Sequence, residues 1–280
     1  STTHLVAASE RYFRQEIAAE IEADNPQIAT APVLLLEGVA IADGGLRRIN
    51  RVQVVGVDSS FSKIARTDIY SKLTDNEIII SKNLADGLEV AEGDNLLLRI
   101  KKASLMPLNA PFVSAEETSV SLRAVVKKIA GKEDMGRFNL KTSQSAPYNI
   151  FISGKELNRL MNFEGRANNI LISTGLDNED IRQTVSRCLA PADAGLRIKQ
   201  IDEPGETEIS SERVFMEPAI SRTIGQLPDA KPLITYFVNS IVISGEGLNA
   251  NDENEQRVVP YSFVSSIDEK WLADDEIILT

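Results

Sequence analysis

The 280-residue sequence has a net charge of −11, one cysteine and one histidine. The negative charge argues against nucleic acid as a partner, because phosphates are bound by a basic face. It also disfavours docking on anionic lipid by charge alone. Cys188 by itself can form no intramolecular disulfide, and His4 by itself rules out Ser–His, Cys–His and multi-histidine metal chemistry. No apolar run approaches the roughly 18–20 residues that span a bilayer.

The chain is predicted to begin with a helix. Ser9 is a candidate N-cap, and Phe13, Ile17 and Ile21 follow at a spacing of four residues on one face. This helix should end before Pro26, because the residue that precedes a proline is biased away from helical geometry.

A long hairpin is expected next. Apolar stretches at 28–41 and 47–57 flank the turn signal Asp43-Gly44-Gly45, so they should pair as antiparallel strands. Beyond the hairpin the pattern predicts a buried strand at 77–81, a helix at 82–88, a tight turn at Gly93-Asp94 and a strand at 95–101.

The middle of the chain alternates between strands and short connections. The pattern predicts a strand at 119–129, a loop or exposed hairpin at 130–145, a strand at 148–152 and a helix at 155–161.

A strand–helix–strand unit is expected between residues 169 and 201. Asp177 and Asp180 resemble an acidic capping box at the start of a helix. The apolar stripe of this helix is Ile181, Val185 and Leu189. Strands at 169–173 and 196–201 flank the helix, and a right-handed crossover is the default if the two strands are parallel.

The C-terminal part contains an internal repeat. Residues 202–208 are the best linker candidate, and a helix at 217–226 and strands at 232–244 and 258–264 are expected after it. Residues 272–280 (LADDEIILT) then repeat residues 73–81 (LTDNEIIIS), with five of nine positions identical. In the first copy a helix follows this strand, so we expect the sequence to be a piece of a longer protein.

Several patterns suggest chemistry, but each has a simpler structural explanation. Ser60 and Lys63 fit Ser-x-x-Lys, yet the Ser-Asp-Asn and Lys-Thr-Gly elements that accompany this motif in hydrolases are missing. The loop 249–255 has oxygen ligands at alternate positions, but it lacks the glycine and the final glutamate of an EF-hand. Glu203 and Glu206 flank a Pro-Gly turn with no sign of a cleft. Trp271, the sole tryptophan, is expected to cover a neighbouring strand.

The order of several short motifs points to a family. These motifs are Val54-Val55-Gly56-Val57-Asp58, the acidic-apolar strand 75–81, Leu84-Ala85, Gly93-Asp94, the strand 122–126 and Asn168-Asn169-Ile170-Leu171-Ile172. Together they resemble the MacB-like periplasmic core domain of FtsX/MacB/LolC-type ABC transporter permeases. The resemblance covers roughly residues 1–201, and segments 235–239 and 259–262 resemble a subgroup with a longer ectodomain.

The resemblance implies an α+β fold in three parts. A porter-like subdomain of β-α-β units would comprise residues 1–95 with 165–203. A mainly-β, Sabre-like subdomain would be inserted at 96–164. Residues 204–280 would be a linker and the start of a second, truncated repeat.

The resemblance also implies a function without catalysis. The chain would be the extracytoplasmic, periplasmic part of an inner-membrane permease, with no catalytic, cofactor-binding or metal-binding residue. It would transmit ATP-driven movement for export, lipoprotein release or control of the cell envelope. Its partners would be a cytoplasmic ABC ATPase acting through the full-length permease, a second permease copy in a homo- or heterodimer, and an extracytoplasmic protein or lipoprotein substrate.

Two alternatives stay open at this point. The chain could be a freestanding extracytoplasmic binding or adaptor module, which would carry a secretion signal but no spanning helix. It could also be a hydrolase that uses Ser60 and Lys63, although the shortage of histidine weighs against this. The permease hypothesis predicts an apolar segment of about 20 residues immediately before Ser1 in the full-length protein.

Overall fold

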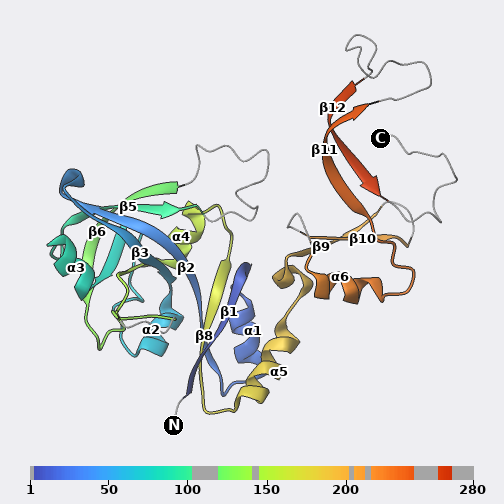
Figure 1. The fold of residues 1–280 in the computed structure, drawn as a ribbon. Helices are drawn as coiled ribbons and strands as arrows, with labels where there is room; N and C mark the ends of the chain where they lie inside the picture. The colour runs from blue at the N-terminus through green and yellow to red at the C-terminus, as the bar shows by residue number, and fades with distance from the viewer. Residues whose placement is uncertain are drawn as a thin grey trace. The chain divides into compact units, whose positions relative to one another are not determined.

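The computed structural model describes residues 3–102, 119–140, 145–201, 205–211, 216–242 and 258–266 (Figure 1). The chain divides into two compact units, residues 1–214 and 215–280, and each unit is described by itself. Strands make up most of the regular structure and helices pack against them, so the α+β class expected from the sequence is confirmed. Within the described part of the chain, every helix is too short or too polar to span a bilayer.

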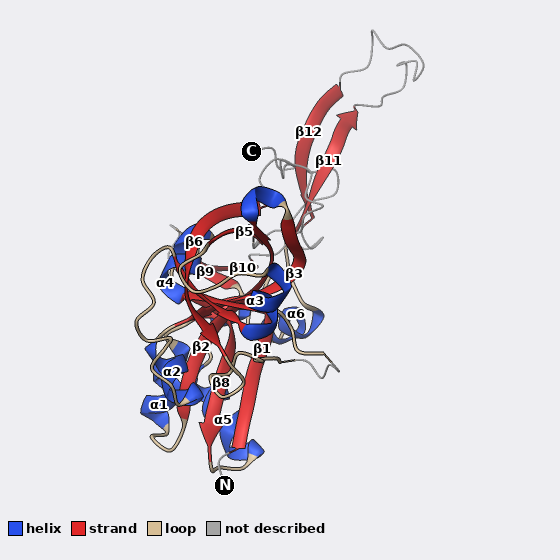
Figure 2. Cartoon of the chain, turned by 90° about the vertical axis from the view of Figure 1, so that its left-hand side faces the viewer, coloured by secondary structure: helices blue, strands red, loops and turns tan. Residues whose placement is uncertain are grey.

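Six strands of the first unit close into a barrel. Around the ring they are β2 (Ala29–Ala42), β3 (Arg47–Val57), β7 (Asn149–Ser153), β4 (Glu77–Ser81), β6 (Ser119–Ala130) and β5 (Asn95–Lys101), and β5 pairs again with β2. β3 pairs in parallel with β7 and β4 with β6, while the other neighbours in the ring are antiparallel. Figure 2 views the ring almost end-on.

The ring closes at a glycine in the middle of β2. Gly38 pairs with Ile100 of β5, and a Cβ atom at Gly38 would lie 2.8 Å from the carbonyl oxygen of Arg99 and 3.0 Å from Val54. A side chain at this position would push β5 away from β2. Glycine therefore allows β2 to pair with β3 along one edge and with β5 along the other.

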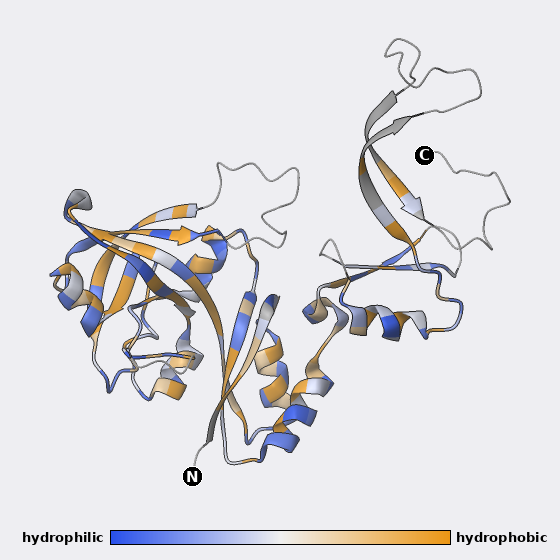
Figure 3. Ribbon diagram, viewed as in Figure 1, coloured by the Kyte–Doolittle hydropathy of each residue, from blue (hydrophilic) through white to orange (hydrophobic). Residues whose placement is uncertain are grey.

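The interior of the barrel is filled by side chains. Alternate residues of each strand point inward and form one apolar cluster, as the two-residue period of a strand requires. Helices α3 (Lys82–Leu88) and α4 (Gly154–Leu160) add Leu84, Leu88 and Leu157 to the same cluster. Figure 3 shows the resulting apolar stripes along the strands. The barrel is thus a packed core and not a channel.

A second core covers the outer face of the barrel at β3, β4 and β7. Helix α2 (Ser59–Ala65) contributes Phe61, whose ring lies 4.9 Å from Tyr70 and 5.7 Å from Phe138, centroid to centroid. Phe151 of β7 completes the group, with its ring 4.8 Å from Tyr70. The tilted and edge-on geometries are those that aromatic rings prefer. The loop expected at 130–145 is present over its described residues, but Phe138 within it is buried.

A separate layer extends the sheet beyond the barrel. β8 (Arg166–Thr174) pairs antiparallel with the first part of β2, and β1 (Thr3–Arg14) pairs antiparallel with β8. Helices α1 (Ile17–Asp24) and α5 (Asn178–Cys188) pack with these strands in a third apolar cluster. Strand β2 is shared, because residues 29–33 pair with β8 and residues 34–42 pair with β3.

The prediction of a helix from Ser9 onward is wrong for the first half of that segment. Residues 3–14 form β1, and the helix starts only at Ile17. Pairing with β8 outweighed the local pattern, since Phe13 on the strand and Ile17 and Ile21 on the helix are all buried in the same cluster. The strand register shifts between Ala8 and Phe13.

Most of the other predicted elements are confirmed. The structure has the hairpin 29–57, the strand 77–81, the helix 82–88 and the strand 95–101 where the sequence placed them. Gly93 has a φ of 95°, as the expected turn requires. The Asp94 carboxylate accepts from the N–H of Ala91, three residues back, and not from a residue further on.

The predicted β-α-β unit at 169–201 is not formed as a single sheet. Asp177 does cap α5, accepting from the N–H groups of Glu179 and Asp180. However, β9 (Leu196–Gln200) pairs with β10 (Thr207–Ser211) in a separate two-stranded sheet, and not with β8. Leu189 follows the helix and is exposed, so the apolar stripe ends at Val185.

The second unit contains a helix and a hairpin in its described residues. α6 (Pro218–Gly225) precedes β11 (Ile234–Val242), which pairs antiparallel with β12 (Val258–Ser266). These elements agree with the sequence prediction. The loop 249–255, Trp271 and the repeat 272–280 lie outside the described residues.

Candidate functional site

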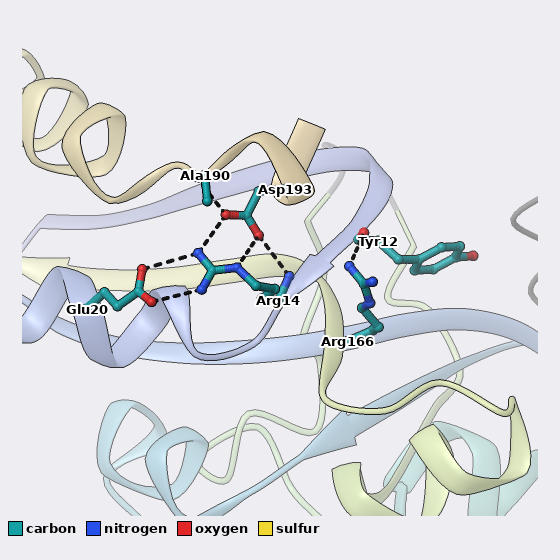
Figure 4. Close-up of polar contacts among 6 residues, drawn as sticks. All are labelled: Tyr12, Arg14, Glu20, Arg166, Ala190 and Asp193. Atoms are coloured by element: carbon teal, nitrogen blue, oxygen red, sulfur yellow. Dashed lines mark hydrogen bonds and ion pairs between the residues drawn. The ribbon is translucent and has the colours of Figure 1, made fainter. Parts of the chain in front are cut away.

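A buried ion pair ties the end of β1 to the 3-10 helix η3 (Pro191–Ala194) (Figure 4). The Asp193 side chain is fully buried. Its Oδ1 accepts from the backbone N–H and the Nε–H of Arg14, both at 3.1 Å, and its Oδ2 accepts from Nη2 of Arg14 at 2.8 Å. The same Oδ2 accepts from the N–H of Ala190 at 2.9 Å. Each oxygen of this carboxylate therefore accepts two hydrogen bonds.

A second carboxylate holds the other side of the Arg14 guanidinium. Glu20 of α1 accepts from Nη1 at 2.9 Å and from Nη2 at 3.3 Å. Arg14 thus lies between two acidic groups that come from different elements. We call the group of Arg14, Glu20 and Asp193 the β1–η3 joint.

The charges of the joint stabilise one another. Burial by itself raises the pKa of Asp193, but hydrogen bonds from Arg14 and from the Ala190 backbone outweigh it and hold the pKa below its ordinary value. The hydrogen bonds to Asp193 and then to Glu20 raise the pKa of Arg14. Arg14 and Asp193 are therefore both charged at neutral pH.

Further contacts fix the same part of the chain. Arg11 of β1 donates to the carbonyl oxygen of Ala194, and Arg187 of α5 pairs with Asp24 of α1 at 2.6 Å. Residues 187–194 are thus held to β1 and α1 before the chain continues to β9. The joint therefore attaches the segment that follows α5 to the end of β1.

A cleft of about 750 Å³ lies between the barrel and the β1–β8 layer. Its walls include Leu34 of β2, Val57 of β3 and Phe163. Two of its polar side chains make structural contacts. Asn158 donates to Gly154 and accepts from the N–H of Arg166, and Arg159 pairs with Asp75 at 2.9 Å.

The sequence-predicted chemical candidates are not assembled into a site in the described residues. Ser60 and Lys63 lie on α2, where the Ser60 hydroxyl donates to Asp58, the N-cap of that helix. Asp58 also accepts from the N–H groups of Ser60 and Phe61, so this serine belongs to an ordinary helix start. Glu203, the 249–255 loop and Trp271 lie outside the described residues. In the part of the chain that the structure describes, no three acidic, histidine or cysteine side chains are grouped to hold a metal ion.

No protein-family model matches the sequence, and no curated protein matches it either. Among solved structures, the periplasmic region of MacB from Actinobacillus actinomycetemcomitans has a TM-score of 0.42 and 7% identity over 81% of this chain and 94% of that one. The extracellular domain of the noncanonic ABC-type transporter YknZ from Gram-positive bacteria has a TM-score of 0.41 and 12% identity, over 68% and 92%.

A third structure, a domain of a permease protein from Porphyromonas gingivalis, has a TM-score of 0.40 and 13% identity, over 67% of this chain and 84% of that one. The chain resembles MacB-like ectodomains. These are the proteins that the sequence motifs predict.

The motifs behind the resemblance have structural roles in this chain. The Val54–Asp58 motif is the end of β3 together with the cap of α2. Gly93-Asp94 forms the turn before β5, and Asn168 bonds the backbone of Leu35 through both amide atoms, at 2.8 and 2.9 Å. The Asn168 contacts cross between β8 and β2 at the point where the layer meets the barrel.

The joint itself was missed in the sequence. Arg14 and Asp193 are far apart in the chain, and an arginine or an aspartate at a strand end or a turn is common. The run Pro191-Ala192-Asp193-Ala194-Gly195 does signal a turn, with Gly195 at a φ of 69°. That signal locates a turn but gives no partner for its carboxylate.

Proposed function

We propose that the chain is a non-catalytic extracytoplasmic domain of an ABC transporter permease that transmits ATP-driven movement to a substrate or partner outside the membrane. The observation that carries the proposal is the continuity of β2. One strand belongs both to a closed, filled barrel and to the β1–β8 layer. A close-packed body of this kind passes a displacement from one end to the other with little deformation.

The joint supports the same role. It fastens η3, which follows α5, to the end of β1 and to α1 through a buried ion pair. Such an attachment makes β1 and the segment after α5 move together. Displacement of either end would reach the barrel through β8 and β2.

We propose no catalytic role and no cofactor for this domain. The Ser60 hydroxyl is engaged by the Asp58 cap, and Asn158 and Arg159 of the cleft make structural contacts. The described residues bring together no nucleophile with a neighbouring base of the kind that acyl-transfer enzymes use.

The subdomain assignment is also a proposal. The β1–β8 layer with α1 and α5 suits a porter-like subdomain, and the barrel suits the mainly-β, Sabre-like insert. The boundaries expected from the sequence, 1–95 with 165–203 and 96–164, stay a prediction. The apolar clusters favour an insert that begins within β2, because Leu34 to Ile100 and Leu122 to Phe163 share one core.

The proposed partners follow from this role. They are a cytoplasmic ABC ATPase acting through the full-length permease, a second permease copy, and an extracytoplasmic protein or lipoprotein. The domain would lie on the outer side of an inner membrane, attached to it by segments elsewhere in the full-length protein.

The test uses the full-length protein with its ATPase in lipid nanodiscs. A donor fluorophore is placed on the barrel at Lys132→Cys, an exposed position, in a Cys188→Ser background, with an acceptor on the lipid headgroups. We expect energy transfer to change when ATP is added and to return after hydrolysis. A matched control carries both dyes on the barrel, at Lys132→Cys and Lys101→Cys, and should show no change because the barrel is rigid.

Two results would contradict the proposal. One is an energy transfer to lipid that ATP leaves unchanged while the ATPase is active. The other is a full-length protein without any membrane-spanning segment, which would favour the freestanding binding or adaptor module.

A further inference from the structure

Positive charge is concentrated on four strands of the barrel. The sequence as a whole is acidic, with 41 aspartates and glutamates against 30 lysines and arginines. Strands β2, β3, β5 and β6 reverse this balance. β3 contains three basic residues, β5 two and β6 three, while Glu37 of β2 is the one acidic residue of the four strands. A local excess of charge of this kind attracts and selects partners of opposite charge.

The register of these strands places two arginines on either side of an apolar pair. Arg48 of β3 lies opposite Ile41 of β2. Ile41 lies opposite Leu97 of β5, and Leu97 lies opposite Arg123 of β6. Because directly opposed residues of antiparallel strands point to the same face, the four side chains form one row across the four strands.

A second row lies beside the first. Val39 of β2 lies opposite Arg99 of β5. Ala40 and Leu98, which alternate with these residues along the strands, are buried in the barrel interior, so both rows point outward. We call the group that the two rows form the arginine face. Its members are Val39, Ile41, Arg48, Leu97, Arg99 and Arg123.

The arginines of this face have no carboxylate of their own. Arg48, Arg99 and Arg123 are exposed, whereas the aliphatic side chains between them are half-buried. In the described ranges of the chain, none of the three arginines forms an ion pair. Glu37 pairs instead with Lys101, at 2.9 Å. The described part of the chain therefore leaves the charge of this face without a neutralising carboxylate.

The spacing of the face suits an extended chain. Along β5, Leu97 and Arg99 are two residues apart, which is about 7 Å in a strand. A second extended chain presents every other side chain on one side at the same interval. A guanidinium binds a carboxylate through two parallel hydrogen bonds, and the aliphatic residues beside it offer apolar contact. A segment that alternates acidic and aliphatic side chains would meet both kinds of group.

We propose that the arginine face binds an extended acidic protein segment in which glutamate or aspartate alternates with an aliphatic residue on one side. A protein segment is favoured over an anionic bilayer for two reasons. The net charge of −11 opposes approach of the whole molecule to such a bilayer, whereas a bound segment meets only the face. The half-buried aliphatic residues of the face also expose too little apolar surface to anchor in lipid.

The test uses the whole 280-residue chain and a fluorescent peptide that repeats Glu-Ser-Leu-Ser, so that glutamate and leucine alternate on one side. The control peptide has glutamine in place of glutamate. Binding is measured by fluorescence anisotropy at low and at physiological ionic strength. The double variant Arg99→Gln with Arg123→Gln is compared with Arg137→Gln with Arg182→Gln, which removes the same charge from two exposed arginines outside the face.

We expect the acidic peptide to bind more tightly than the glutamine peptide, and more weakly as ionic strength rises. Substitution of Arg99 and Arg123 should weaken binding by about fivefold or more, because two ion pairs are lost, while the control double variant should stay within about twofold. Absence of peptide binding, equal binding of the two peptides, or equal weakening by the two double variants would overturn the proposal.

Two other occupants of the face would overturn it as well. Vesicles of phosphatidylcholine with phosphatidylserine that bind the chain, and lose it when Arg99 and Arg123 are replaced, would make the face a lipid surface. A dimer in sedimentation velocity that the same replacement dissociates would make the occupant a second copy of the chain. The inference does not rest on the transport function, because peptide binding and the ATP-driven change in energy transfer can each occur without the other.

Discussion

The two hairpins of this chain have the same topology but very different surroundings. β2 and β3 are built into a closed ring whose interior is apolar throughout, whereas the described side chains of β11 and β12 are partly or largely exposed. An isolated two-stranded hairpin is only marginally stable, so strand pairing alone contributes little. What stabilises the first hairpin is the burial of its inward-facing residues by strands that come from later in the sequence.

The units also differ in how their polar groups are used. In the first unit a buried carboxylate and an arginine join β1 to η3, and an N-cap aspartate begins α2. α6 of the second unit has no side-chain cap hydrogen bond, as is also true of α1, α3 and α4 of the first.

The largest effect is expected from the aromatic core. Phe151→Ala should lower the free energy of unfolding of the first unit by about 3–5 kcal/mol, because the side chain is fully buried among Phe61 and Tyr70. Val264→Ala in the second unit should change stability by no more than about 0.5 kcal/mol. Urea unfolding followed by hydrogen exchange of each unit measures both. A large cost for Val264→Ala would mean that β12 is already packed.

The second effect concerns the joint. Arg14→Met leaves Asp193 as a buried charge without its partner and should cost about 3 kcal/mol at neutral pH. The matched change, Arg222→Met, removes an exposed side chain that donates to Pro218 and should cost little. Equal effects of the two substitutions would show that the joint does not hold η3 in place.

Acid separates a broken ion pair from a simple loss of packing. The pKa of Asp193 is lowered in the folded protein, so its contribution is present above the ordinary carboxyl pKa and is lost as pH falls through the folded value. In Arg14→Met, burial without the arginine should raise this pKa, and the variant should regain stability as pH falls from about 7 to 4. A variant whose deficit is the same at every pH would contradict this account.

The smallest effect tests barrel closure. Gly38→Ala places a Cβ atom 2.8 Å from the Arg99 carbonyl oxygen and should cost about 1–3 kcal/mol, with faster exchange along β5. Gly225→Ala in α6 meets no atom within 4 Å and should be neutral or slightly stabilising, since alanine favours a helix. If Gly38→Ala were equally harmless, β5 would not be held against β2 at this point.

The local pattern of the sequence predicted most of the elements that pack through one face. The turn at Asp43-Gly44-Gly45, the helix 82–88 and the Asp177 cap all have signals within a few residues, and each is found. The prediction failed at β1, where a helical spacing of apolar residues coincides with a strand. The strand wins there because β8 offers a pairing edge that nothing near Ser9 in the sequence reveals.

Local sequence patterns predicted the α+β class and most of the elements in their order, because these depend on neighbours along the chain and on composition. Only the tertiary structure decided that β5 returns to β2 and closes a ring, that β9 leaves the main sheet, and that Arg14 meets Asp193. These contacts join residues far apart in the chain. Their energies come from packing and desolvation between elements, which no local pattern encodes.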